Sequence, residues 1–249
     1  LGLASPSLQY DTTVNASLKP NKGLTLKTKR DVANSLAYSA PYWLQQPHSL
    51  GTFTIPHSSL IGKPEAGAPL QLQAHISLNG EKLIVNVPLI YKTVDPVKGE
   101  LNRTVEVVPP VFVNMEKDVV IFNSQAPQPV AVTVKSSGKE KINGVLKLEL
   151  PQGWKSEPTE IPFELSKQGE EQIKSFTIHP TAGEGKFALR AMATVNGVNY
   201  NQSLKTITYD HIPVQTLMPP AEIKAVRIDL KKEGNVIGYI KGAGDDVPQ

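Results

Sequence analysis

Hydrophobic and polar residues alternate along much of this chain with a period of two. The clearest runs are 130–134, 146–150 and 187–195, in which every second residue is Val, Leu, Ala or Phe. Alternation of this kind places one face of a strand in a core and the other face in solvent, as in antiparallel sheets. Helical periodicity is weak, and the 21 prolines argue against long helices. The pattern predicts an all-β protein.

Two Asn-Gly dipeptides indicate tight β-hairpins. Asn79-Gly80 separates the alternating segments 74–78 and 83–91, and Asn196-Gly197 separates 191–195 from 198–204. Asn followed by Gly readily supplies the two positive φ angles of a type I′ turn, whose twist matches that of the flanking strands. We therefore expect a two-residue hairpin at each position.

A Pro-Pro spacer at residues 109–110 divides the strand-rich sequence into units of about 100 residues, the size of an immunoglobulin-like β-sandwich. The predicted architecture is two tandem immunoglobulin-like β-sandwiches. The first spans 1–108 and contains a loop-rich insertion, and the second spans 109–208. We expect Trp154 to close the core of the second sandwich.

Residues 209–249 are predicted to form a connector that leads toward an α/β domain. A strand at 225–230 is expected to pair as a hairpin with the apolar segment that starts at Val236. The glycine-rich sequence 242–244 then suggests a turn, and Asp246 with Pro248 suggests the first turn of a helix. The sequence stops there, so we expect the chain to be part of a larger protein. A dinucleotide site is disfavoured because Val247 stands where the third glycine of the fingerprint is required.

Composition narrows the classes of partner and of chemistry. The formal net charge is +3, and the basic residues are scattered apart from Lys27, Lys29 and Arg30, so no nucleic-acid interface is predicted. No apolar run reaches the ~20 residues that span a bilayer. The chain has no cysteine, which excludes disulfides, thiolate nucleophiles and cysteine-based zinc sites.

Motifs that carry catalysis are absent from the sequence. It contains no His-Glu-x-x-His zinc motif, no Gly-x-Ser-x-Gly nucleophile elbow and no phosphate-binding P-loop. We therefore predict no catalytic residue, no cofactor site and no metal site, and the chain is not expected to be an enzyme.

One aromatic cluster is the candidate contact site. Tyr38, Tyr42 and Trp43 fall within seven loop-like residues, although the chain has only 2 Trp, 7 Tyr and 6 Phe. Exposed Tyr and Trp rings offer large, rigid contact areas at low entropic cost. Three interpretations remain open: a loop that plugs one end of a sandwich, a contact with another domain, and a glycan-binding surface.

Five segments together resemble a known family. They are YSAPYWL at 38–44, DPVKGE at 95–100, LPQGW at 150–154, YDHIPVQ at 209–215 and IGYIKGAGDD at 237–246. In this order they are similar to the non-catalytic region of large exported bacterial proteins of the PIG-L/LmbE family, which are zinc-dependent de-N-acetylases acting on N-acetylglucosamine-type substrates. The second unit resembles the NEW3-type sandwich found beside carbohydrate-active domains.

The resemblance implies a non-catalytic accessory region that spaces a de-N-acetylase domain and a downstream α/β domain of the same polypeptide, in the periplasm or outside the cell. The alternative that it implies is a carbohydrate-binding module that uses the loop from Tyr38 to Trp43. The family's zinc site depends on a His-Pro-Asp-Asp segment, whereas Asp245-Asp246 here follows Gly244. No metal ligand or catalytic residue carries over.

Overall fold

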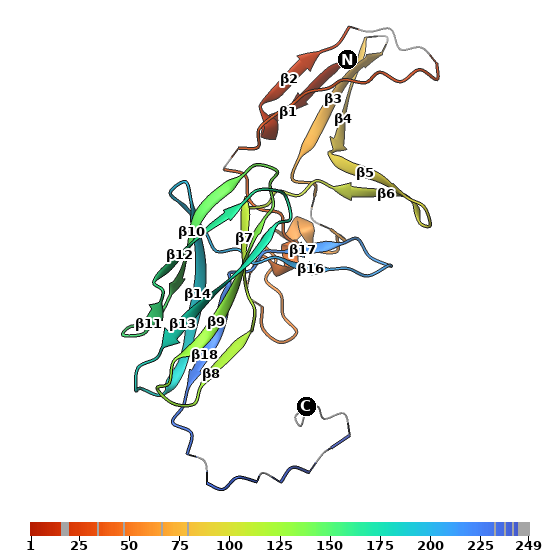
Figure 1. Ribbon diagram of the computed structural model, residues 1–249. Helices are drawn as coiled ribbons and strands as arrows, with labels where there is room; N and C mark the ends of the chain where they lie inside the picture. Colours follow the sequence, from red (N-terminus) through yellow and green to blue (C-terminus); the bar gives the residue numbers. More distant parts are fainter. Residues whose placement is uncertain are drawn as a thin grey trace.

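The computed structural model describes residues 1–15, 20–33, 35–46, 48–65, 67–78, 80–231, 233–236, 238–240 and 242–243. Its regular structure is almost entirely β, which confirms the prediction of an all-β protein. The helices among the described residues are three single 3₁₀ turns, η1 (Pro6–Leu8), η2 (Tyr42–Leu44) and η3 (Ser58–Leu60). Two strand-rich regions follow one another along the chain (Figure 1).

The larger region is a pair of facing sheets, which we call the two-sheet unit. One sheet has the order β12-β10-β14-β18-β8, with β15 added to β14, and the other has the order β11-β13-β9-β7. The first sheet is formed by β8 (Val119–Phe122), β10 (Ile142–Glu149), β12 (Glu160–Leu165), β14 (Gly185–Val195), β15 (Val198–Tyr200) and β18 (Glu222–Arg227). The second is formed by β7 (Val111–Met115), β9 (Gln128–Ser136), β11 (Lys155–Glu157) and β13 (Glu171–His179).

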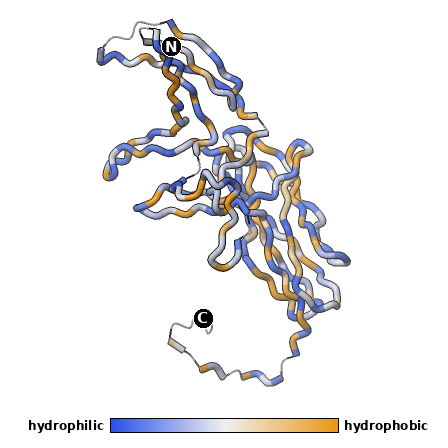
Figure 2. The backbone as a smooth tube through the Cα atoms, turned by 180° about the vertical axis from the view of Figure 1, so that it is seen from behind, coloured by the Kyte–Doolittle hydropathy of each residue, from blue (hydrophilic) through white to orange (hydrophobic). Residues whose placement is uncertain are grey.

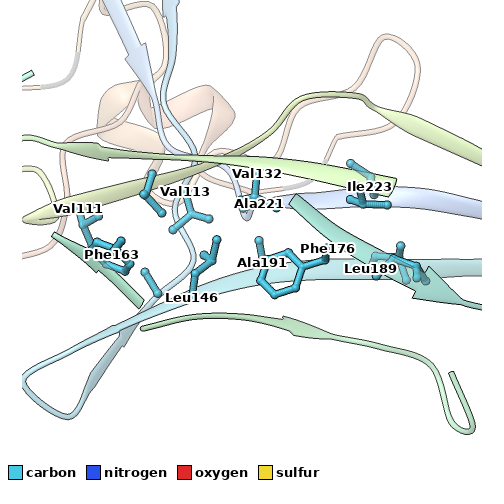
Figure 3. Packing of buried hydrophobic residues seen from close by; sticks show 14 of the residues in the cluster. Val111, Val113, Val132, Leu146, Phe163, Phe176, Leu189, Ala191, Ala221 and Ile223 are labelled. Atoms are coloured by element: carbon cyan, nitrogen blue, oxygen red, sulfur yellow. The ribbon is translucent and has the colours of Figure 1, made fainter. Parts of the chain in front are cut away.

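The two sheets share one hydrophobic core. On β9 the alternating valines at 130, 132 and 134 are all buried, as their spacing predicts. They belong to the same cluster as Leu146, Phe176 and Leu189, and Figure 3 shows such side chains between the layers. Trp154 is buried in this core, with its ring centroid 5.0 Å from that of Phe122, which confirms the role predicted for it.

Both predicted Asn-Gly hairpins are confirmed. Asn196 and Gly197 have φ angles of 49° and 78°, as a type I′ turn requires, and Val195 pairs with Val198 across the turn. The strand that follows, β15, is shorter than predicted and ends at Tyr200. The other hairpin joins β3 (Gln71–Leu78) to β4 (Glu81–Pro88), with Leu78 paired to Glu81, while Asn79 of its predicted turn lies outside the described residues.

The predicted hairpin between 225–230 and the segment from Val236 is wrong. Strand β18 lies between β14, to which it is antiparallel, and β8, to which it is parallel. Its alternate residues Ile223, Ala225 and Arg227 are buried, so this face of the strand already packs inside the two-sheet unit. Residues 233–236, 238–240 and 242–243 have no regular secondary structure. The predicted turn at Gly244 and the helix start at Asp246 and Pro248 lie outside the described residues.

The smaller region, which we call the N-terminal sheet, is a single antiparallel sheet of order β2-β1-β3-β4. Its first strands are β1 (Gly2–Ser5) and β2 (Tyr10–Thr13). Among the described residues up to 108, no second sheet faces it, so a first β-sandwich is not confirmed. The segments that a second sheet would need, 20–33 and 48–65, contain no strand. Hydrophobic stretches in this sheet are visible in Figure 2.

Two hairpins lie between these regions. One is formed by β5 (Ile90–Asp95) and β6 (Gly99–Thr104), and the other by β16 (Lys205–Ile207) and β17 (Gln215–Leu217). In Figure 1 both extend to the same side of the molecule, beside the loop that contains η2. The two hairpins and this loop surround the candidate site.

Candidate functional site

The aromatic loop binds to the segment that joins the N-terminal sheet to the two-sheet unit. The Ser39 N–H donates to the Val107 carbonyl at 2.8 Å, and the Val107 N–H donates to Ser39 Oγ at 2.8 Å. Val107 and Leu70 are both buried here. Leu89 adds backbone bonds to Leu70 and Val105, at 3.0 and 3.1 Å. We call this hydrogen-bonded region the junction.

Tyr42 is an anchor within the junction rather than an open contact surface. Its side chain is 7% exposed, and its hydroxyl donates to the Lys63 carbonyl at 2.8 Å. The Trp43 ring meets the Tyr42 ring edge-on, with centroids 4.9 Å apart and an interplanar angle of 90°. Such edge-to-face pairs are favourable beyond the area they bury. Both rings therefore hold the loop in place.

Tyr38 lines a cleft of about 400 Å³ beside the junction. The cleft is bounded by the loop at 37–45, by the end of β6 and by the start of β17. Tyr38 is 37% exposed, and burial together with the charge of nearby Tyr200 raises the pKa of its phenol. Of the three predicted candidates, Tyr38 lines the cleft, whereas Tyr42 and Trp43 do not.

The cleft carries a set of hydrogen-bonding side chains that the sequence did not indicate. They are Gln45, Glu65, Asn102, Arg103, Glu106 and Gln215. Thr216 Oγ1 donates to Glu106 at 3.0 Å and so ties β17 to the junction. The residues come from segments far apart in the chain and follow no motif, so local sequence reasoning could not group them.

Two of the five segments quoted above, 38–44 and 209–215, line the cleft, and a third, 95–100, contacts one of them. Tyr38 comes from the first and Gln215 from the fourth, and both line the cleft. The second contributes Lys98, whose ammonium lies 2.5 Å from Asp210 Oδ1, in the same segment as Gln215. The hydrogen bond from Lys98 holds the pKa of Asp210 below its ordinary value.

The chemistry of this site suits the binding of a polar ligand. The side chains offer amide, carboxylate and guanidinium groups around one aromatic ring. In the part of the chain that the structure describes, no three His, Asp or Glu residues come close enough to hold a metal ion. Nor does any helix in that part have the length and apolarity to cross a bilayer.

Comparison with family models and curated proteins identifies no relative of this chain. No family model matches the sequence, and no curated protein matches it. The geometry of the junction and the cleft is therefore the basis for a functional proposal.

Proposed function

We propose that this chain is a non-catalytic accessory region that spaces and orients two other domains of its polypeptide. By the resemblance in the sequence, these are a zinc-dependent de-N-acetylase domain and an α/β domain, in the periplasm or outside the cell. By the same resemblance, the two-sheet unit is an immunoglobulin-like sandwich of the NEW3 type. Its two facing sheets and single core support that assignment.

The observation that carries the proposal is the arrangement of the two strand-rich regions. The N-terminal sheet and the two-sheet unit follow one another in an elongated arrangement, and the junction lies between them (Figure 1). Two regions joined in this way suit a role in holding neighbouring domains apart.

A spacer must also hold its parts in a fixed relation, and the junction supplies the contacts to do so. The reciprocal hydrogen bonds of Ser39 and Val107 fix the loop to the chain segment that enters the two-sheet unit. The Tyr42–Lys63 bond closes the loop on itself. These bonds are partly shielded from water, so each loses less to competing solvent than a surface bond would.

Distance measurements between the two regions test this proposal. The chain has no cysteine, so Ser77→Cys and Ser166→Cys, both at exposed positions, accept two spin labels without further changes. A rigid spacer gives one narrow distance distribution. Ser39→Ala combined with Tyr42→Ala should broaden it, and Ser35→Ala, at an exposed position before the loop, should not.

Two results would overturn the proposal. One is a broad distance distribution in the unsubstituted junction, because a flexible linker cannot orient its neighbours. The other is release of acetate from N-acetylated sugars by the purified chain with zinc, because a catalytic site would then be present.

A carbohydrate-binding role is the second candidate, and the cleft favours it. A partly exposed tyrosine ring beside amide, carboxylate and guanidinium side chains can stack on a sugar ring and bind its hydroxyl groups. Calorimetry with N-acetylglucosamine oligomers should show binding that Tyr38→Ala and Arg103→Ala remove. Tyr91→Ala, at an exposed position on β5 outside the cleft, is the matched control. The absence of heat at millimolar sugar would contradict this role.

A further inference from the structure

One face of the N-terminal sheet is strongly apolar, and the strand register shows why. Leu3 of β1 pairs with Ala74 of β3, which pairs with Val85 of β4. Because side chains alternate between faces, every second residue on each strand shares this side. The face is formed by Leu3, Leu72, Ala74, Ile76, Leu83, Val85 and Val87. The opposite face is mainly polar, with Gln71, Gln73, His75, Ser77, Lys82 and Asn86.

An extended segment, residues 22–30, lies over part of this apolar face. Its alternate residues Leu24, Leu26, Thr28 and Arg30 line the same groove as Leu3 and Leu72 of the sheet. The intervening residues Thr25, Lys27 and Lys29 do not line it. The segment makes no strand ladder with the sheet. It therefore forms one wall of the groove without closing onto the strands below.

The groove is open to solvent and has a volume of about 590 Å³, within the range of about 300–1,000 Å³ for small-molecule sites. Most of its lining is leucine, together with the ring of Tyr10. Ser5 is fully buried, but its hydroxyl donates to the Gln71 carbonyl at 2.7 Å and is already satisfied. The interior consequently favours an apolar chain. The leucines are Leu1, Leu3, Leu8, Leu24, Leu26, Leu72 and Leu89.

The charges of the groove all have one sign. Lys22 and Arg30 are the only ionisable side chains of Lys, Arg, His, Asp or Glu in the described lining, and both are cationic. The Arg30 guanidinium lies 5.0 Å from the centroid of the Tyr10 ring, a cation–π contact that holds it beside the groove. Lys22 and Arg30 stand at opposite ends of the extended segment, about 26 Å apart at ~3.3 Å per residue. A ligand that complements the Arg30 end of the site is apolar along its length and anionic at that end.

We propose that this groove binds a long-chain fatty acid, with the alkyl chain among the leucines and the carboxylate at Arg30. Segment 22–30 forms one wall of the groove and keeps the flat face of a second protein copy off the strands there, whereas a single alkyl chain is narrow enough to lie along the leucines. A neutral sugar would leave the leucines without a partner. This site is separate from the cleft at Tyr38 and does not depend on the function proposed for it.

A series of saturated fatty acids tests the proposal on the whole chain, by calorimetry below the micelle concentration of each. Each added methylene should raise the affinity by up to about fourfold until the groove is filled. The alcohol of equal chain length should bind about tenfold more weakly, because it lacks the charge-assisted contact. Absence of saturable binding, or equal binding of acid and alcohol, would overturn the proposal.

Matched variants on the covering segment separate the groove from general surface effects. Arg30→Gln should weaken fatty-acid binding about tenfold, and Lys29→Gln, which removes the same charge next to it, should leave binding unchanged. Leu26→Asn should weaken binding, and Thr25→Asn should not. Circular dichroism on each variant verifies the fold. Equal losses at the paired positions would mean that the cations attract the ligand without a groove, contrary to the proposal.

Discussion

The two-sheet unit and the N-terminal sheet are built from the same alternating pattern but bury it differently. Val132 on β9 is 0% exposed, whereas Val85 on β4 is 37% exposed, although each lies on the apolar face of its strand. A facing sheet covers Val132, and among the described residues no sheet faces Val85. Alternation therefore indicates that a face is apolar, but it does not indicate what covers that face.

The energetic consequence is that the regions differ in what stabilises them. Full burial of an aliphatic or aromatic side chain contributes about 1.5–3 kcal/mol, and partial burial proportionately less. The two-sheet unit gains this contribution from a whole cluster of side chains. The N-terminal sheet has fewer fully buried side chains and depends more on the hydrogen bonds between its strands. A ligand bound in its groove would therefore raise its stability.

The largest effect is expected in the core of the two-sheet unit. Phe176→Ala should lower the free energy of unfolding by about 3–5 kcal/mol, because the ring is fully buried and leaves a cavity. Ile173→Ala on the same strand, at a side chain 68% exposed, should cost less than about 0.5 kcal/mol. Urea unfolding followed by the fluorescence of Trp154, in a Trp43→Phe background that isolates its signal, measures both. Similar losses would show that this core is not packed as described.

Two glycines, one in each region, allow the packing density of the two regions to be compared. In β10, a Cβ on Gly144 would lie 2.5 Å from the Phe163 ring and 2.7 Å from the Thr194 carbonyl, so Gly144→Ala should cost about 1–3 kcal/mol. In β1, the nearest atom to a Cβ on Gly2 is His75 Cβ at 3.3 Å, and Gly2→Ala should change stability by less than about 0.5 kcal/mol. Calorimetric melting curves distinguish the two, and a larger loss at Gly2 would reverse the comparison.

The junction between the regions should show an intermediate effect. Tyr42→Phe removes the hydroxyl that donates to the Lys63 carbonyl and should destabilise the loop by about 0.5–1.5 kcal/mol. The emission of Trp43, whose ring contacts Tyr42, is the readout, with Trp154→Phe as the background to isolate its signal. Tyr38→Phe in the same background is the control and should leave the transition unchanged. If both substitutions act equally, the Tyr42 hydroxyl is not the anchor.

The smallest effect concerns the exposed contact between the β5–β6 turn and the segment before β17. Lys98→Met should return the lowered pKa of Asp210 to its ordinary value, because the hydrogen bond from Lys98 is the main cause of the shift. The pKa of Asp95 should stay low, because backbone N–H groups of Lys98 and Val97 are its main causes.

Carbon-detected NMR titration of both carboxyl groups measures this difference. Since the Asp210 pKa is lowered, its contact contributes above the ordinary aspartate range and is lost as the pH falls through the lowered pKa. A pKa for Asp210 that does not respond to Lys98→Met would show that the pair does not form in solution.

The parts of the fold that depend on neighbouring residues could be predicted from the sequence. The valines of β9, the Asn196-Gly197 turn and the burial of Trp154 all follow from local spacing and turn chemistry. The position and partner of β18 do not. The sequence predicts a strand at 225–230, whereas β18 spans Glu222–Arg227 and pairs with β8, about 100 residues away. A hairpin with the next apolar segment was the expected local solution, and it is wrong.

In the candidate site, too, some residues could be predicted from the sequence and others could not. Tyr38 could be named because aromatic residues cluster in its loop. Arg103, Glu106 and Gln215 could not, because only the arrangement of the two hairpins brings them to the same cleft. Tyr42 belongs to the same aromatic loop as Tyr38, but it is buried and anchors the loop, whereas Tyr38 lines the cleft. The sequence of the loop could not distinguish the two roles.

The position of β18 also constrains how this protein can be made. Strand β8 ends at Phe122 and its one neighbour in the described sheet is β18, which starts at Glu222. A ribosome that adds about 5–20 residues per second needs roughly 5–20 s to synthesise the chain between them. During that interval the backbone groups of β8 have no ladder partner from β18, and such an edge can pair with other chains. Completion of the sheet therefore has to wait until the segment that starts at Glu222 has been synthesised.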